Sequence, residues 1–222
     1  MRWLVALVAA VAALAPSPTA AATVPVVRCP TLNVTGSTPS PPAAVRVLGS
    51  PASTAGLSAY SNGEQLIVGP AGMSCHGQLA QDGGAELLVW PKRKRRPGRH
   101  AHTAGLSLFA DPACIGCQAD DACPFFAAFA RKLGFPCSTG VPVGETVDRR
   151  GSHLVLFEDP AGIAGDGWPS GGPDPANGLV AIHGGLGVEA PARTVYRATC
   201  TLPQRAHATC RTSLDDLIAR YL

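Results

Sequence analysis

The spacing of apolar and polar residues along the chain predicts a domain built mainly of β-strands. Several short runs are rich in β-branched and large apolar residues, and turn residues such as Gly and Pro bound most of them, as is typical of strands. These runs cover residues 44–48, 65–68, 85–90, 106–109, 153–157, 179–182 and 194–198.

Residues 122–133 have the apolar period of a helix instead. Asp121 is the expected N-cap, and Gly134 followed by Pro136 is a typical helix end. One face of this helix would carry four large apolar side chains, namely Phe125, Phe126, Phe129 and Leu133. Because it holds three of the six Phe of the chain, we expect this helix to anchor the core.

A second helix is expected at 213–222, with Ser213 as N-cap and Asp216 at the third helical position. Its apolar stripe consists of Leu214, Leu217, Ile218 and Tyr221. The two helices do not alternate with the strands in the manner of βαβ units. The sequence therefore predicts an α+β fold with a mainly antiparallel sheet and two helices, at about 122–133 and 213–222.

The first residues have the pattern of a secretory signal peptide. A positive start at Arg2 precedes 13 apolar residues from Trp3 to Ala15, and small residues follow up to Ala22. The apolar run is too short to span a membrane, which takes about 20 residues. We therefore predict a signal peptide at 1–22, a Pro/Thr/Ser-rich linker or tail at 23–45 and one disulfide-bonded domain at 46–222.

All eight cysteines follow the predicted leader, and an even number in an exported chain indicates disulfides. They are Cys29, Cys75, Cys114, Cys117, Cys123, Cys137, Cys200 and Cys210. Eight cysteines allow 105 pairings, so the connectivity is not readable from the sequence. The best single guess is Cys200–Cys210, which would join the last strand to the terminal helix.

Two other interpretations exist for the cysteines between 114 and 137. Four thiolates could bind zinc, but a second C-x-x-C pair, common in zinc modules, is absent from this block. The Cys114-x-x-Cys117 pair could be redox-active, because such pairs lie at helix starts after strands. The predicted helix start at residue 122 lies closer to Cys123, however, and no thioredoxin-like βαβ pattern appears, so both observations disfavour this interpretation. We predict no metal ion and no cofactor.

The charge is unevenly distributed along the chain. Six of the 18 Lys and Arg residues lie within residues 91–102: Lys92, Arg93, Lys94, Arg95, Arg96 and Arg99. Without these six and the leader Arg2, the chain has 11 basic and 15 acidic residues, a net charge of −4. The segment is typical of a solvated loop, and it is also a candidate site for a polyanion or an anionic membrane surface. His100 and His102 are weak metal ligands without a third partner.

A long segment rich in Gly, Pro, Ala and Asp runs from residue 159 to 178 and contains Asp159, Asp166 and Asp174. Loops of this length are typically functional or rigid surface loops. Calcium is chemically possible, although the spacing differs from that of an EF-hand. A rigid loop with Trp168 against the body is the favoured interpretation.

No catalytic motif is complete. Ser74-Cys75-His76 lacks the G-x-S-x-G pattern of a nucleophile elbow. Glu158 and Asp159 are adjacent, so in a strand they point to opposite faces. The weak catalytic candidates are Glu158, Asp159 and His183, if the fold brings them to one cleft.

Five short motifs together resemble a group of exported actinobacterial proteins of unknown function. The motifs are Phe157-Glu158-Asp159-Pro160, Pro169-Ser170-Gly171-Gly172, Pro175-Ala176-Asn177-Gly178, Cys123-Pro124-Phe125-Phe126 and Cys200-Thr201-Leu202-Pro203. The similarity covers residues 44–222 and implies export and a disulfide-bearing domain, with no activity or catalytic residue to transfer.

These observations favour an exported, disulfide-stabilised protein with a non-enzymatic role outside the cell or in the cell envelope. An extracellular hydrolase, and a polyanion or membrane-surface binder acting through 91–102, are the alternatives. The partner is unknown, and nothing predicts specific nucleic-acid binding or a transmembrane segment after the leader.

Overall fold

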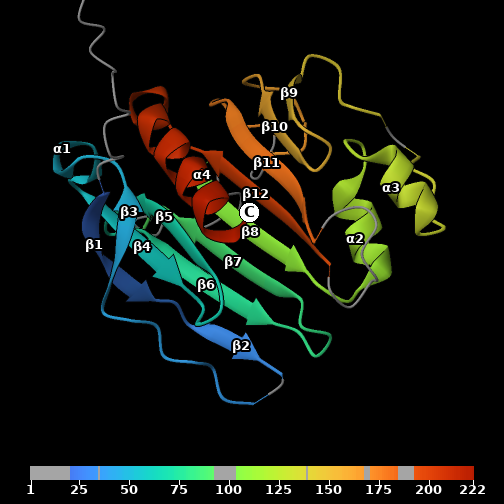
Figure 1. Ribbon diagram of the computed structural model, residues 1–222. Coiled ribbons are helices and arrows are strands. Elements are labelled where there is room, and N and C mark those ends of the chain that lie inside the picture. The colour runs from blue at the N-terminus through green and yellow to red at the C-terminus, as the bar shows by residue number, and fades with distance from the viewer. Residues whose placement is uncertain (1–20, 35, 93–103, 139, 168–170, 185–192) are drawn as a thin grey trace, which may run out of the picture.

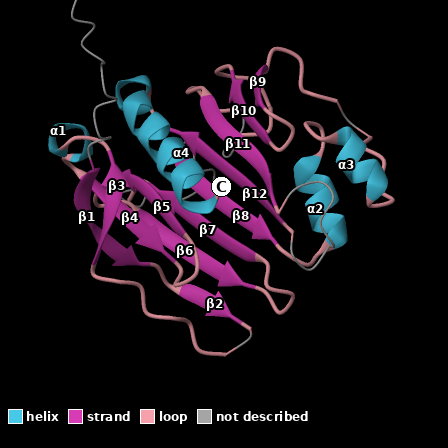
Figure 2. Ribbon diagram, in the orientation of Figure 1, coloured by secondary structure: helices cyan, strands magenta, loops and turns pink. Residues whose placement is uncertain are grey.

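The computed structural model describes residues 21–34, 36–92, 104–138, 140–167, 171–184 and 193–222 (Figure 1). A large sheet of eight strands and a small sheet of four form the body, and helix α4 (His207–Tyr221) crosses one face of the large sheet. Figure 2 shows that strands dominate the described part of the chain, as the sequence predicted. The fold is α+β, mainly antiparallel and disulfide-bonded.

The large sheet has the order β2-β6-β7-β8-β12-β11-β10-β9. Its neighbours pair antiparallel, apart from the parallel pair β2 and β6. The strands are β2 (Thr31–Asn33), β6 (Ser74–Leu79), β7 (Ala85–Trp90), β8 (Gly105–Asp111), β9 (Thr146–Arg150), β10 (Leu154–Asp159), β11 (Ala176–His183) and β12 (Thr194–Thr201).

The small sheet has the order β3-β1-β4-β5, and β1 pairs antiparallel with β3 and parallel with β4. Its strands are β1 (Ala21–Arg28), β3 (Ala44–Leu48), β4 (Leu57–Ser61) and β5 (Leu66–Pro70). A short helix, α1 (Pro51–Thr54), lies between β3 and β4, and Ser50 caps it by accepting a hydrogen bond from the Ser53 N–H. The end of α4 is bound to this sheet, since the Leu66 N–H donates to the Tyr221 hydroxyl at 2.8 Å.

The two faces of the large sheet bury different clusters. Because successive residues of a strand point to opposite faces, Leu154 and Leu179 lie in one cluster, while Val155 and Val180 lie in another. The first cluster contacts α4 and the small sheet, and the second contacts the segment of α2 (Ile115–Ala122) and α3 (Ala127–Lys132).

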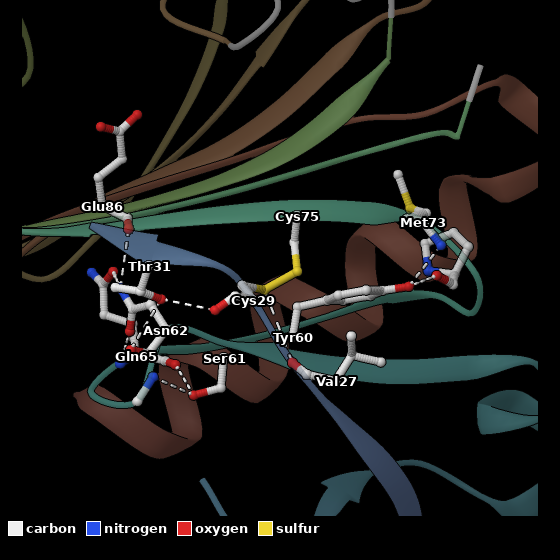
Figure 3. Close-up of a disulfide and its surroundings, with 12 residues drawn as sticks. Val27, Cys29, Thr31, Tyr60, Ser61, Asn62, Gln65, Met73, Cys75 and Glu86 are labelled. Carbon is white, nitrogen blue, oxygen red and sulfur yellow. Dashed lines mark hydrogen bonds between the residues drawn. A yellow bond between two sulfur atoms is a disulfide. The ribbon is translucent and has the colours of Figure 1, made fainter. Parts of the chain in front are cut away.

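The N-terminal segment differs from the prediction of a linker at 23–45. Residues 21–28 and 31–33 form β1 and β2, and Val24 is buried. Cys29 between them is bonded to Cys75 of β6, as Figure 3 shows. The prolines that suggested a tail lie largely between strands, and sheet pairing orders the segment around them.

A buried polar turn joins the small sheet to the large one (Figure 3). Asn62 and Gln65, between β4 and β5, are almost fully buried and hydrogen-bond each other at 2.9 Å. The Asn62 amide also donates to the Glu86 carbonyl of β7 at 3.0 Å, and the Gln65 amide donates to the Ala85 carbonyl at 3.2 Å. These bonds satisfy amide groups that would be costly to bury unpaired.

The prediction of a single helix at 122–133 is wrong about where the helix begins. The structure has α2 (Ile115–Ala122) and then α3 (Ala127–Lys132), so Asp121 lies inside α2 and is not an N-cap. Pro124 causes the break, because proline lacks an N–H and disfavours the helical conformation of the residue before it. Cys123 is accordingly extended, with φ −70° and ψ 139°. The expected core contact is confirmed for the three phenylalanines of this segment, Phe125, Phe126 and Phe129.

The terminal helix is longer than predicted. A short 3-10 turn (η2, Gln204–Ala206) leads into α4 (His207–Tyr221), so Ser213 is a buried interior residue and not the N-cap. Cys210 lies in this earlier part and is bonded to Cys200 of β12, which confirms the predicted pair. Within the described residues, no helix is long and apolar enough to cross a membrane.

Candidate functional site

The structure does not bring the three weak catalytic candidates together. Asp159 pairs with Ala176 at one end of β11, whereas His183 lies at the opposite end and is exposed. Glu158 is exposed and points to the other face of β10 from Asp159, which is buried. A cleft of Glu158, Asp159 and His183 is therefore excluded by the register of β10 and β11.

All eight cysteines form disulfides: Cys29–Cys75, Cys114–Cys117, Cys123–Cys137 and Cys200–Cys210. The four-thiolate zinc interpretation of the middle block is thus wrong, and Cys75 is no nucleophile. No group of three or more His, Cys, Asp or Glu side chains in the described ranges is arranged to hold a metal ion. Ser74 and His76 lie on β6, where His76 is exposed.

The basic segment lies largely outside the described residues. Lys92 is described and exposed, while Arg93, Lys94, Arg95, Arg96 and Arg99 are not described, nor are His100 and His102. The segment connects β7 to β8.

A pocket of about 320 Å³ lies beside the Cys123–Cys137 bridge. Its apolar lining residues include Pro124, Phe135, Pro136 and Pro142. Its charged lining residues are Asp120 of α2, Asp166 of the Gly-rich loop and Arg197 of β12. Two carboxylates and one guanidinium leave this lining with a net negative charge.

Arg197 is held in place by acids from two separate segments. Its Nη2 donates to the Asp166 carbonyl at 2.6 Å and to Asp166 Oδ1 at 3.0 Å. Its Nη1 lies 3.6 Å from Oδ1 of Asp121 on α2. Burial raises the pKa of Asp166, although the charge of Arg197 acts in the opposite direction. Arg197 therefore bridges the loop and the helix across the face of β12.

The Gly-rich loop is held by the carboxyl groups of the buried Asp159 and the half-buried Glu145. The Gly167 N–H donates to Asp159 Oδ2 at 2.6 Å, and the Asp166 N–H donates to Glu145 Oε2 at 3.5 Å. A Cβ at Gly165 would overlap the Asp159 carboxylate, so this position requires glycine. These contacts agree with the predicted rigid loop for its described residues, whereas Trp168, expected against the body, lies outside the described residues.

Two acids near the pocket have a raised pKa because each is partly buried beside another carboxyl group. Burial, the hydrogen bond to Asp159 and its charge raise the pKa of Glu145 to about 8. Burial, the hydrogen bond to Asp121 and its charge raise the pKa of Asp111, at the end of β8, to about 8. Glu145 and Asp111 are thus mostly protonated at neutral pH, which relieves the repulsion that two neighbouring carboxylates would otherwise have.

The start of α2 places the Cys114–Cys117 bridge next to this region. Cys114 is the N-cap, and its Sγ accepts a hydrogen bond from the Cys117 N–H at 3.1 Å. A Cβ on Gly116, between the two cysteines, would lie 3.9 Å from the ring of Phe135, which also lines the pocket. Phe135 therefore lies beside the first turn of α2 and also lines the pocket.

Sequence reasoning missed most of this site. Arg197 is the single charged residue of β12, a weak signal for a role beyond strand formation. Glu145, Asp111 and Phe135 have no local pattern that would single them out. Comparison of the chain with protein-family models, with curated proteins and with solved structures found no match.

Proposed function

We propose that this chain is an exported protein, stabilised by four disulfides, that binds a cationic ligand in the pocket beside Cys123–Cys137. Export is supported by the leader-like pattern of residues 1–22, by the resemblance to exported actinobacterial proteins and by the pairing of all eight cysteines. Removal of 22 residues would leave Thr23–Arg28 of β1, which includes the contacts of Val24 and the parallel pairing with β4.

The charge of the pocket lining carries the proposal on the ligand. Asp120 is exposed and makes no salt bridge in the described part of the chain, whereas Arg197 is already paired with Asp121 and Asp166. An arriving anion would meet these carboxylates, and a cation would be attracted by them. The walls formed by Pro124 and Phe135 suit an apolar portion of the same ligand.

The volume and chemistry of the pocket therefore fit a peptide segment in which Lys or Arg stands beside an apolar residue. A binding role is favoured over hydrolysis because Glu158 and His183 lie apart, and because Asp159 is occupied with the Gly-rich loop.

Titration calorimetry with blocked Lys-Phe and Glu-Phe dipeptides tests this proposal. We expect Lys-Phe to bind and Glu-Phe not to bind. Asp120→Asn should weaken Lys-Phe binding about two- to fivefold, the effect of one exposed ion pair. Asp215→Asn, an exposed change on α4, is the control and should leave the affinity unchanged. Equal affinity for both dipeptides, or no binding of either, would contradict the proposal.

Export has a separate test. The mass of the secreted protein should correspond to the loss of 22 N-terminal residues and of eight hydrogens, two for each disulfide. Free thiols in the secreted protein, or an intact leader, would contradict it.

The basic residues of 91–102 support polyanion binding as a second function. These six positive charges lie in one segment, whereas the rest of the chain after removal of the leader has a net charge of −4. Neutralising Lys92, Arg93, Lys94, Arg95, Arg96 and Arg99 should abolish salt-sensitive retention on heparin. Unchanged retention of the neutralised protein would exclude this second function.

A further inference from the structure

Helix α2 carries disulfide cysteines at both of its ends. Cys114 is the N-cap and is bonded to Cys117 in the first turn, whereas Cys123 is the C-cap and is bonded to Cys137. The same helix thus presents one bridge at its positive end and another at its negative end, which allows the two to be compared directly.

The helix ends act on the two bridges in opposite directions. A thiolate is stabilised at a helix N-terminus, where unpaired N–H groups and the dipole favour negative charge. The Cys117 N–H already donates to Cys114 Sγ, and the first turn of α2 contains no acidic residue. Cys123 lies where the dipole disfavours negative charge. Reduction of Cys114–Cys117 therefore produces the more stable thiolate.

The Cys114–Cys117 bridge is also the least important of the four for holding the chain together. It closes a loop of separation 3, against 46, 14 and 10 for the other bridges. A shorter closed loop restricts the unfolded chain less, so breaking it costs less stability. Opening this bridge leaves the other three disulfides in place around the core.

The bridge is accessible, and apolar surface flanks it. Cys114 and Cys117 are half-buried, as are Cys123 and Cys137, whereas Cys29, Cys200 and Cys210 of the two other bridges are at most 2% exposed. Ile115, between the two cysteines, is 42% exposed, and Phe135 against Gly116 is 46% exposed. Exposed Ile and Phe side chains beside a reactive sulfur provide contact surface for an unfolded or extended polypeptide.

We propose that Cys114–Cys117 is a redox-active disulfide that exchanges with the dithiols and disulfides of polypeptide substrates. The sequence disfavours such a pair because the helix is expected to start at residue 122 and because no thioredoxin-like βαβ pattern appears. The helix starts instead at Ile115, directly after Cys114 and a few residues after β8, so the first of these objections does not apply.

The exchange is a balanced two-electron reaction. A substrate thiolate attacks Cys114 Sγ and forms an S–S bond, the Cys114–Cys117 bond breaks, and Cys117 leaves with the electron pair and takes a proton. The second substrate thiolate then attacks the substrate sulfur of the mixed disulfide, and Cys114 leaves as a thiolate. The substrate dithiol becomes a disulfide, one of its two protons is on Cys117 and the other is in solvent. A disulfide of another protein or of a small thiol reoxidises the pair by the reverse steps.

The first test is equilibration of the secreted protein with glutathione buffers of increasing reducing power, followed by alkylation and mass mapping. We expect Cys114 and Cys117 to be half-reduced at a ratio of reduced to oxidised glutathione at least tenfold lower than Cys123 and Cys137. Reduction of both bridges of α2 at the same ratio, or of Cys123–Cys137 first, would overturn the proposal.

The second test is the pH dependence of thiol alkylation in Cys117→Ser, with Cys137→Ser as the matched variant that leaves Cys123 free. The midpoint for Cys114 should lie at least one pH unit below the value of about 8.5 for a free thiol, and that for Cys123 should not. Mapped alkylation rates of the partly reduced wild-type protein give the same comparison if a variant does not fold. A Cys114 midpoint at 8.5 or above would overturn the proposal.

The third test is covalent trapping with an unstructured peptide containing a Cys-x-x-Cys disulfide. Cys117→Ser should retain the peptide as a mixed disulfide through Cys114, and Cys114→Ser should retain at least tenfold less. Equal trapping by the two variants would contradict the assignment of Cys114 as the attacking thiolate. These measurements involve no Lys-Phe dipeptide, so they succeed or fail independently of the pocket ligand.

Discussion

The two faces of the eight-stranded sheet are built from different chemistry. The face under α4 is apolar: Leu87, Leu106 and Leu179 lie there with Leu214 and Leu217 of the helix. The opposite face has a smaller apolar cluster in which Phe125 stacks on Phe157 with ring centroids 5.1 Å apart. Beside that cluster the same face carries charged groups that an apolar core would exclude.

The charged part of the second face holds together by mutual pairing. Arg197 is paired with acids of the loop and the helix, and the buried Asp159 accepts the Gly167 N–H. Such a network adds less stability than apolar packing, because the charges lose their hydration when they are buried. We infer that the α4 face supplies most of the stability. The second face contributes less to stability, and it carries the pocket and an accessible disulfide.

The largest effect should come from the apolar face. Leu217→Ala removes a side chain that is 2% exposed and leaves a cavity between α4 and the sheet. We expect the free energy of unfolding to fall by about 2–5 kcal/mol, measured by urea denaturation. Asp215→Ala, two residues away on the exposed side of α4, is the control and should change it by less than about 0.5 kcal/mol. A similar loss in the free energy of unfolding for both variants would contradict the inference that the α4 face supplies the stability.

A change on the second face should lower stability less than Leu217→Ala does, and it should also weaken ligand binding. Gly165→Ala places a Cβ on the Asp159 carboxylate and moves the loop that lines the pocket. We expect a loss of about 1–3 kcal/mol of stability, and loss of Lys-Phe binding by the folded protein. Gly140→Ala at the rim of the same pocket meets no atom within 4 Å, so it should alter neither quantity. Binding by Gly165→Ala at wild-type affinity would separate the loop from the pocket's function.

The smallest effect is a pH dependence located on the second face. The pKa of Glu145 is about 8 in the folded protein and near 4.5 when unpaired, so the folded state binds more protons between these values. Its contribution to stability is therefore complete below about pH 4.5 and is lost as the pH rises through 8. We expect the melting temperature of the wild-type protein to fall more steeply than that of Glu145→Gln between pH 5 and pH 8.

Asp111, with a pKa of about 8, also stabilises the folded protein less as the pH rises. The contribution of Glu145 is therefore measured by the difference between the wild-type and Glu145→Gln curves, and not by the slope of the wild-type curve alone. Glu158→Gln, an exposed change on the neighbouring strand β10, is the control and should follow the wild-type curve. Parallel curves for wild type and Glu145→Gln would show that the proton on Glu145 does not contribute to stability.

Local patterns predicted the elements whose cause is local. The strands at 44–48 and 85–90 were predicted with the observed bounds, because β-branched and apolar residues fill them and turn residues bound them. The Cys200–Cys210 pair was predictable because the two cysteines are close in sequence, at the end of a strand and near a helix. The break before α3 follows from Pro124 once the rule for the residue before proline is applied.

Elements that depend on distant partners were missed. All five residues of β4 are buried, including Ser58 and Ser61, so no alternation reveals the strand. In β6 the run Ser74-Cys75-His76 suggested a nucleophile, yet pairing with β7 makes it a strand. α4 begins before Ser213 because burial of Cys210 extends the helix beyond the residue that local capping preference would choose.

The candidate site also depends on residues that are far apart in the sequence. Asp121, Asp166 and Arg197 come from a helix, a loop and a strand, and strand order alone brings them within reach of one another. The chemistry that residue types and spacing determine is the disulfide content, the basic segment and the apolar stripe of each helix. Which cysteines are accessible, which acids have a raised pKa and which face holds the pocket depend on contacts between segments far apart in the chain. Burial and Coulomb interactions depend on which groups are close in space, and the tertiary structure brings these groups together.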